Sequence, residues 1–152
     1  MARQQDESVL LYSGVSAPVI KQQEATGLST TTYYKGDCVH IDNSGYITIA
    51  TGKFILGMAV SRCTGVDYVD ADVELIDFNA LYLITAGAST AVARATIGET
   101  CDITYTPDAH VHAASTTNSV ICVVGIYEGN DATTDGGRYI FRFNAAEVVA
   151  GT

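Results

Sequence analysis

The chain repeats one short pattern. Residues 36–39 read Gly-Asp-Cys-Val and open a stretch that closes on Ile-Leu-Gly-Met-Ala at 55–59. A second stretch opens on Gly-Glu-Thr-Cys at 98–101 and closes on Val-Val-Gly-Ile-Tyr at 123–127, so the openings are 62 residues apart and the closings 68. Two copies are too few for a solenoid, because each solenoid repeat needs neighbours on both sides. The pattern therefore predicts a duplicated unit whose copies pack together in one domain.

The apolar residues favour strands over helices. The chain has 7 Leu against 27 Val plus Ile, and β-branched side chains lose rotamer freedom in a helix but fit a pleated sheet. Turn sequences such as Asp-Asn-Ser-Gly at 42–45 separate short apolar runs. About ten short strands at this spacing predict an all-β fold, a compact β-sandwich or barrel made of two tandem pseudo-repeats.

A length of 152 residues predicts a single domain. We expect an extended N-terminal arm at 1–32 and one β domain at 33–152, divided into a first copy at about 33–90 and a second at about 91–152. The alternative is that the arm supplies an ordinary first strand of the sandwich. If it is an arm that crosses onto a neighbouring subunit, the core should fold without residues 2–24.

Two sets of residues follow from this division. The apolar residues of the arm predict an interface with another subunit or with a partner protein, and they are Leu10, Leu11, Tyr12, Val19 and Ile20. The glycines of the repeated motif are expected to define the fold, and they are Gly36, Gly57, Gly98 and Gly125. A glycine inside a strand, such as Gly57, usually marks a bulge or a close approach of another backbone.

The charge pattern argues against several partners. The net charge is −9, and no stretch clusters more than two basic residues, Arg138 and Arg142, within five positions. Nucleic-acid binding usually needs a basic patch, so we expect none. The sequence has no run of eighteen apolar residues, so we expect no membrane span. Its polar start predicts a cytosolic product. The four widely spaced cysteines are expected to be small buried hydrophobes, with Cys38 and Cys101 in equivalent positions.

Signatures of chemistry are weak. Asp67, Asp70 and Asp72 lack the Gly and Glu that an EF-hand loop requires, so they indicate a solvated acidic loop. A three-histidine metal site would need His40 from the first copy to approach His110 and His112 from the second, and surface histidines are the favoured alternative. The sequence holds no G-x-S-x-G elbow, Walker A loop or H-E-x-x-H helix. We therefore expect no enzyme, no cofactor and no metal.

The repeated motif resembles the small capsid decoration (cement) proteins of tailed bacteriophages. Gly36, Asp37, Val39, Gly57 and Ala59 carry the resemblance, which covers about residues 33–144, whereas the second copy departs from it at Glu99 and at 126–127. The resemblance implies two tandem β units in one compact barrel or sandwich. It also implies attachment to the major capsid protein on the outside of the head, between neighbouring capsomers. Such proteins are commonly trimers.

The leading hypothesis is therefore a structural virion protein, assembled in the bacterial cytoplasm, that stabilises the capsid exterior as a homo-oligomer, with a trimer favoured. Another phage part, such as a head fibre or a tail component, is the first alternative. A sugar-binding module or small hydrolase on a jelly roll is the second, although the chain has no Trp to stack on a sugar.

Overall fold

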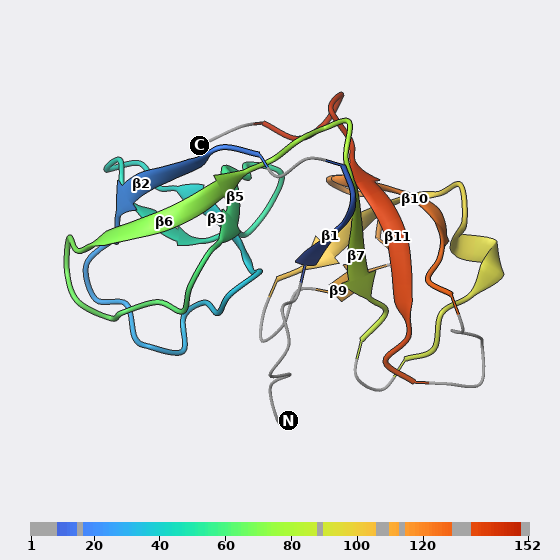
Figure 1. Cartoon of the computed structure of the whole chain (residues 1–152), viewed down its shortest axis with the longest axis horizontal. Helices are drawn as coiled ribbons and strands as arrows, with labels where there is room; N and C mark the ends of the chain where they lie inside the picture. Colours follow the sequence, from blue (N-terminus) through green and yellow to red (C-terminus); the bar gives the residue numbers. More distant parts are fainter. Residues whose placement is uncertain are drawn as a thin grey trace.

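The computed structural model describes residues 9–14, 17–87, 90–105, 110–112, 115–128 and 135–149. These residues form strands and one turn of 3-10 helix, at Arg94–Thr96. The predicted all-β class is confirmed, because two mainly antiparallel sheets pack together as a β-sandwich. In Figure 1 the two sheets lie beside each other, and the chain passes between them where β6 leads into β7.

The first sheet has the order β2-β6-β5-β3-β4, and the second has the order β1-β7-β11-β10-β8-β9. The strands of the first are β2 (Val19–Gln23), β3 (Cys38–Ile41), β4 (Ile47–Ile49), β5 (Gly57–Ala59) and β6 (Asp70–Leu75). Those of the second are β1 (Val9–Ser13), β7 (Leu81–Thr85), β8 (Thr100–Thr104), β9 (His110–His112), β10 (Ile121–Ile126) and β11 (Arg138–Phe143).

Each sheet curls until its ends meet. In the second sheet β9 pairs in parallel with β7 at Thr85 and His110, which closes a ring of five strands with β1 added outside it. In the first sheet the residue after β2, Glu24, forms a parallel bridge to Ile47 of β4. Closure of this kind removes most of the free edges that an open sheet would expose.

The two rings have the same topology. The order β2-β6-β5-β3-β4 becomes β7-β11-β10-β8-β9 when each strand number is raised by five, and the parallel contact that closes the ring falls between corresponding strands. Equivalent backbone bonds fix the register. Gly36 donates its N–H to the carbonyl oxygen of Ala59, and Gly98 donates to that of Val123. The chain is therefore built from two copies of one five-stranded unit.

The structure changes three details of the predicted repeat. The first unit begins at β2 and the second at β7, rather than at residues 33 and 91. Gly57 pairs with Val39, whereas the equivalent partner of Cys101 is Ile121, so Gly125 is not the counterpart of Gly57. The same register makes Cys101 equivalent to Val39 and not to Cys38. The second motif copies the first in its opening, and its similar closing lies four residues too late.

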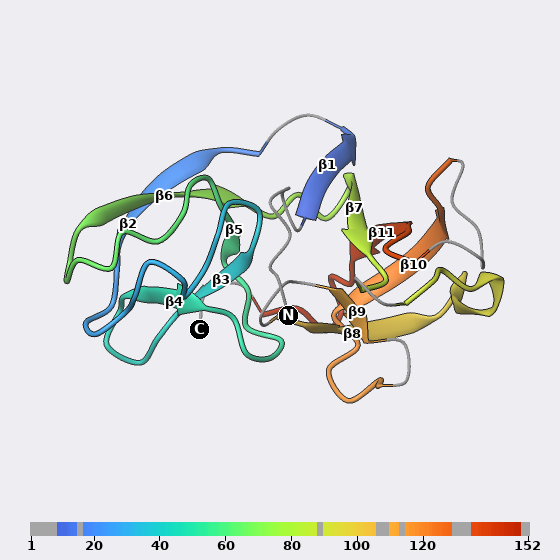
Figure 2. The same cartoon turned by 90° about the horizontal axis from the view of Figure 1, so that it is seen from below.

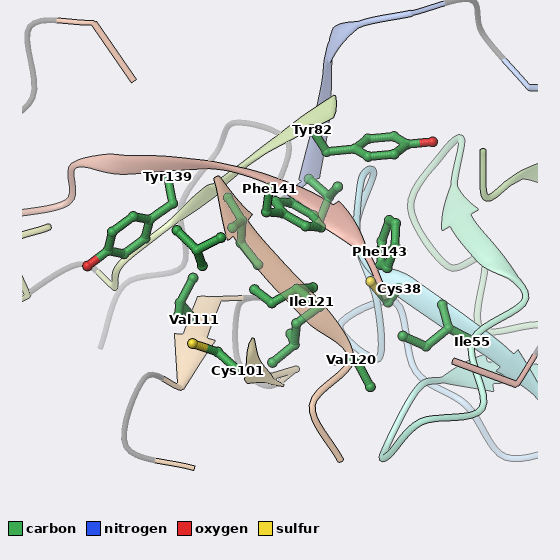
Figure 3. Close-up of a cluster of buried hydrophobic side chains, with 14 of the residues drawn as sticks. Cys38, Ile55, Tyr82, Cys101, Val111, Val120, Ile121, Tyr139, Phe141 and Phe143 are labelled. Carbon is green, nitrogen blue, oxygen red and sulfur yellow. The ribbon is translucent and has the colours of Figure 1, made fainter. Parts of the chain in front are cut away.

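The largest core fills the second ring and continues to the first. Figure 3 shows Tyr139, Phe141 and Ile121 inside the second ring, with Phe143 beside Cys38 and Ile55 of the first unit. A separate cluster fills the first ring, where Val39, Ile47 and Val73 are fully buried. Burial of this apolar area stabilises the fold by about 25 cal/mol per Å². The continuous larger core joins the two rings into one body.

The N-terminal segment belongs to this body. β1 pairs with β7 along Val9 to Ser13, and β2 pairs with β6 along its whole length. Val9 is 3% exposed, and the side chain of Glu24 is fully buried in the first unit. Residues Val19–Gln23 therefore form an ordinary strand of the sandwich, as the alternative reading of the arm predicts, and deleting residues 2–24 would remove the first strand of the first ring.

Gly57 offers a direct test of the first ring. A Cβ there would meet the backbone carbonyl of Glu74 directly and Val73 Cγ1 at 3.0 Å, whereas a Cβ at Gly125 meets only Ile140 Cδ1, at 3.8 Å. We expect Gly57→Ala to lower the free energy of unfolding by about 3 kcal/mol, since β5 and β6 must move apart. Gly125→Ala is the control and should change it little. Urea unfolding measures both, and equal stabilities of the two variants would contradict the predicted close approach.

Candidate interaction surface

The residues predicted to contact a partner divide into two groups. Leu11 packs against the large core and Ile20 against the smaller one, so both serve the fold. Tyr12 and Val19 are exposed by 46% and 54%. Leu10 lies on the outer face of the second sheet, because its neighbours Val9 and Leu11 point toward the core. Three of the five predicted residues therefore face outward.

Two tyrosines lie on this outer face and contact each other. Leu83 lies opposite Leu10 and points outward, since Tyr82 and Ile84 belong to the core, yet it is only 7% exposed. Tyr12 comes from β1 and Tyr127 from the end of β10, and their ring centroids lie 5.9 Å apart, edge to face. Two strands, β7 and β11, separate β1 from β10. The two tyrosine side chains therefore extend across these strands to contact each other.

This outer tyrosine pair, Tyr12 and Tyr127, is accessible to a partner. Tyr127, directly after β10, is 38% exposed, and Val124 of β10 is 39% exposed. Half-exposed tyrosines bury much area at little cost in side-chain entropy, and they are enriched where proteins bind one another. The sequence pointed to Tyr12 through its apolar arm, whereas Tyr127 was missed because it follows a strand that reads as wholly buried.

A cavity of about 220 Å³ lies where β1 meets the first unit. Leu10, Leu11 and Tyr82 line one side, and Met58 and Val60 line the other. Lys35 and Glu74 add charged side chains to the lining. The N–H of Val9 donates to the carbonyl oxygen of Gly36 at 3.2 Å, so the backbone of the arm is bonded to the first unit beside this cavity.

One fully buried carboxylate holds a loop of the first unit. Glu24 Oε1 accepts from Cys63 Sγ at 3.0 Å and from the N–H of Gly65 at 3.2 Å, and Oε2 accepts from the N–H of Thr64 at 3.0 Å. Burial alone would raise the pKa of Glu24, but these hydrogen bonds outweigh it and hold the pKa below its usual value. Burial raises the pKa of Cys63 to about 11, so the thiol stays protonated and donates.

Other buried acids act in the same way. Asp102 Oδ1 accepts from the N–H groups of Asn118 at 2.8 Å and Ser119 at 2.6 Å, and Oδ2 accepts from Ser115 Oγ at 2.6 Å. Asp37 Oδ2 accepts from the N–H of Tyr34 at 2.9 Å. Each carboxylate fixes a loop next to a strand of its own sheet. This use accounts for buried charge in a chain with no catalytic motif in its sequence.

The hydroxyl of Tyr33 is the buried polar atom without a hydrogen-bond partner among the described side chains. Burial, and then the nearby charge of Glu24, raise its pKa well above the usual value, so it remains neutral. The ring of Tyr33 packs in the small core with Cys63. It serves there as an apolar side chain.

The predicted histidines lie on different sheets. His40 is in β3 of the first sheet, where burial lowers its pKa, and His110 and His112 are in β9 of the second. The side chains of His110 and His112 lie outside the described residues. Among the side chains that are described, no group of three His, Cys, Asp or Glu is arranged to hold a metal ion.

The remaining predicted residues take simple positions. Arg138 and Arg142 lie on the face of β11 opposite Tyr139, Phe141 and Phe143, as the alternation predicts. Asp67 accepts the N–H of Gly27 at 3.0 Å, and Asp72 pairs with Lys21 at 3.0 Å. Cys38, Cys63 and Cys101 are buried and Cys122 is half-buried, all as free thiols.

No protein-family model matches the chain, and no curated protein sequence matches it either. Within the part of the chain that the structure describes, none of the helical residues forms a segment long and apolar enough to cross a bilayer. The function must therefore be argued from the surface itself.

The pH dependence of stability tests the role of Glu24. Because its folded pKa is lowered, its stabilising effect is fully present above the unfolded pKa near 4.5 and is lost as pH falls through the folded pKa. Glu24→Gln should cost about 2 kcal/mol of unfolding free energy at pH 7, since the buried N–H groups lose a charged acceptor. The cost should shrink on acidification below the unfolded pKa.

The matched control is Asp67→Asn, which changes an exposed carboxylate in the loop that Glu24 holds. It should change stability little at any pH. Urea unfolding at a series of pH values measures both variants. A constant difference between wild type and Glu24→Gln down to pH 2 would contradict the role given to this carboxylate.

Proposed function

We propose that the chain is a structural virion protein that decorates the exterior of a tailed-bacteriophage head and stabilises the shell between neighbouring capsomers. The observation that carries the proposal is a half-exposed tyrosine pair on the outer face of a rigid, duplicated β body. The partner is the major capsid protein. The protein acts as a homo-oligomer, with a trimer favoured.

Rigidity supports this proposal. A protein that braces a shell must resist deformation, and two closed rings joined by one continuous core supply stiffness. The buried carboxylates of Glu24, Asp37 and Asp102 hold loops against the rings. These groups contribute to shape, which is what a structural component requires.

The tyrosine pair supports attachment. Tyr12 lies on β1, and Leu83 on the same outer face is already shielded from water. A partner that covers the aromatic side chains of Tyr12 and Tyr127 would remove further apolar area from water, which stabilises the complex by about 25 cal/mol per Å². Many copies on a lattice would add their individually weak contacts through multivalency. The net charge of −9 keeps a decorated particle from binding other acidic surfaces.

The test mixes the purified protein with undecorated heads of the phage that encodes it. Wild type should sediment with the heads and raise the temperature at which they break. Tyr12→Ser combined with Tyr127→Ser should weaken binding to the heads at least tenfold, because the interface loses both aromatic side chains. Light scattering of the free protein should give the mass of a trimer.

The control for this experiment is Tyr46→Ser. Tyr46 and Tyr68 form another ring pair, with centroids 4.8 Å apart, on the first unit away from β1. Tyr46→Ser should bind heads as wild type does. A wild-type protein that neither sediments with heads nor stabilises them would refute the proposed function. An equal loss of head binding in the double variant and in Tyr46→Ser would show that the outer tyrosine pair is not the attachment site.

A further inference from the structure

The two units differ at one equivalent place. On the second ring, β1 pairs antiparallel with the outer edge of β7, with Leu10 opposite Leu83 and Leu11 opposite Tyr82. The corresponding edge on the first ring belongs to β2. There, β4 reaches the side of β2 that faces away from β6 only at the end of the strand, where Glu24 bridges Ile47, and none of the described residues pairs with that side at Val19 to Gln22. Figures 1 and 2 show β2 at the border of its sheet, next to β6.

The backbone of β2 has groups free to bond at this edge. Leu75 donates its N–H to the carbonyl oxygen of Pro18, and Glu24 donates to that of Val69, so Pro18, Ile20, Gln22 and Glu24 bond toward β6. The N–H and C=O groups of Val19 and Lys21 therefore point the other way, whereas those of Gln23 lie where Glu24 bridges Ile47 of β4. We call these outward groups the β2 edge. In the described part of the chain no strand pairs with Val19 or Lys21 at this edge.

The register of the duplication shows what an added strand would meet. Ile20 pairs with Val73 as Tyr82 pairs with Phe141, and all four face the core of their own ring. Lys21 is thus the counterpart of Leu83, and a strand placed like β1 would lie opposite Ile20, Lys21 and Gln22. Its inward side chains would cover the ring, as Val9 and Leu11 do in the second unit.

Charge decides which strand fits. The outer face beside the β2 edge carries Asp70, Asp72 and Glu74 from β6, and Lys21 of β2 pairs with Asp72. A second copy would bring another such acidic row and another share of the net charge of −9. Self-pairing is therefore opposed by repulsion, whereas a basic strand is attracted.

We propose that the β2 edge binds an extended basic segment of a partner protein by antiparallel strand addition. The segment has a basic side chain opposite Val19, apolar ones opposite Ile20 and Gln22, an uncharged polar one opposite Lys21, and a second basic side chain just beyond the residue opposite Gln22. Backbone hydrogen bonds supply affinity and the alternation supplies specificity. The identity of the partner as the shell protein rests on the proposed function, but the edge itself does not.

The first test needs no shell. The probe is the blocked peptide Lys-Val-Thr-Val-Lys, titrated into isotope-labelled full-length protein and followed by NMR. Saturable shifts should appear at Val19 to Gln23 and along β6. The same peptide N-methylated at Thr keeps its charge but loses a backbone donor, and it should bind at least tenfold more weakly. Glu-Val-Thr-Val-Glu should not bind. Equal binding of the methylated and unmethylated peptides, or shifts located elsewhere, would overturn the proposal.

A pair of protein variants tests the same edge. Lys21→Pro removes an outward N–H without breaking a bond to β6, and Lys21→Ala removes the charge alone. Only Lys21→Pro should lose peptide binding relative to Lys21→Ala, by at least tenfold. If Lys21→Pro does not fold, the methylated peptide still decides. Sedimentation of the free protein detects the competing occupant, because a self-association lost in Lys21→Pro and kept in Lys21→Ala would overturn the assignment to a foreign strand.

Undecorated heads separate this inference from the proposed function. Heads that bind Lys21→Ala but not Lys21→Pro would assign the strand to the shell protein. Heads that bind both variants equally would overturn that assignment and leave the decorating function intact. Heads that do not bind even the wild type would refute the function, while the peptide titration would still decide whether the edge accepts a basic strand.

Discussion

Each sheet is closed by a parallel contact between the two strands at the ends of its ring, β2 and β4 in the first unit and β7 and β9 in the second. This closure is the constraint on which the rest of the structure depends. Glu24 meets Ile47 in the first unit, and Thr85 meets His110 in the second. Closure turns a short sheet into a ring with a dry interior and satisfies backbone groups that an open edge would leave to solvent. It also fixes where the remaining edges are. One is covered by β1 and the other, on β2, is open.

Duplication followed by unequal use of the two copies accounts for the character of the surface. In the second unit β1 pairs with β7, and its Tyr12 extends across two strands to contact Tyr127. The first unit kept its edge free and its neighbouring face acidic. The two units thus have one topology and two different surfaces. A body of this kind suits a protein that contacts two partners, or two parts of one partner, at once.

Much of the fold was predictable from the sequence, and the failures have physical causes. The shared openings at Gly36 and Gly98 were identified because both need positive φ, at 86° and 89°, which favours glycine. The closings misled because Gly125 imitates Gly57 in sequence, yet only Gly57 lies against a neighbouring backbone. The sequence does not predict β2 as a strand of the ring, because Gln22 and Glu24 occupy positions that face the ring, where apolar residues are expected. Glu24 is tolerated there since three donors from 63–65 satisfy it.

The most direct test of the account is a cryo-EM map of decorated heads at a resolution that separates β-strands. The account predicts the two-ring body on the outer surface between capsomers, with Tyr12 and Tyr127 against the shell and a strand of density beside β2. A map that places this body inside the head or on the tail would contradict it. So would one in which the tyrosine pair faces solvent at every copy.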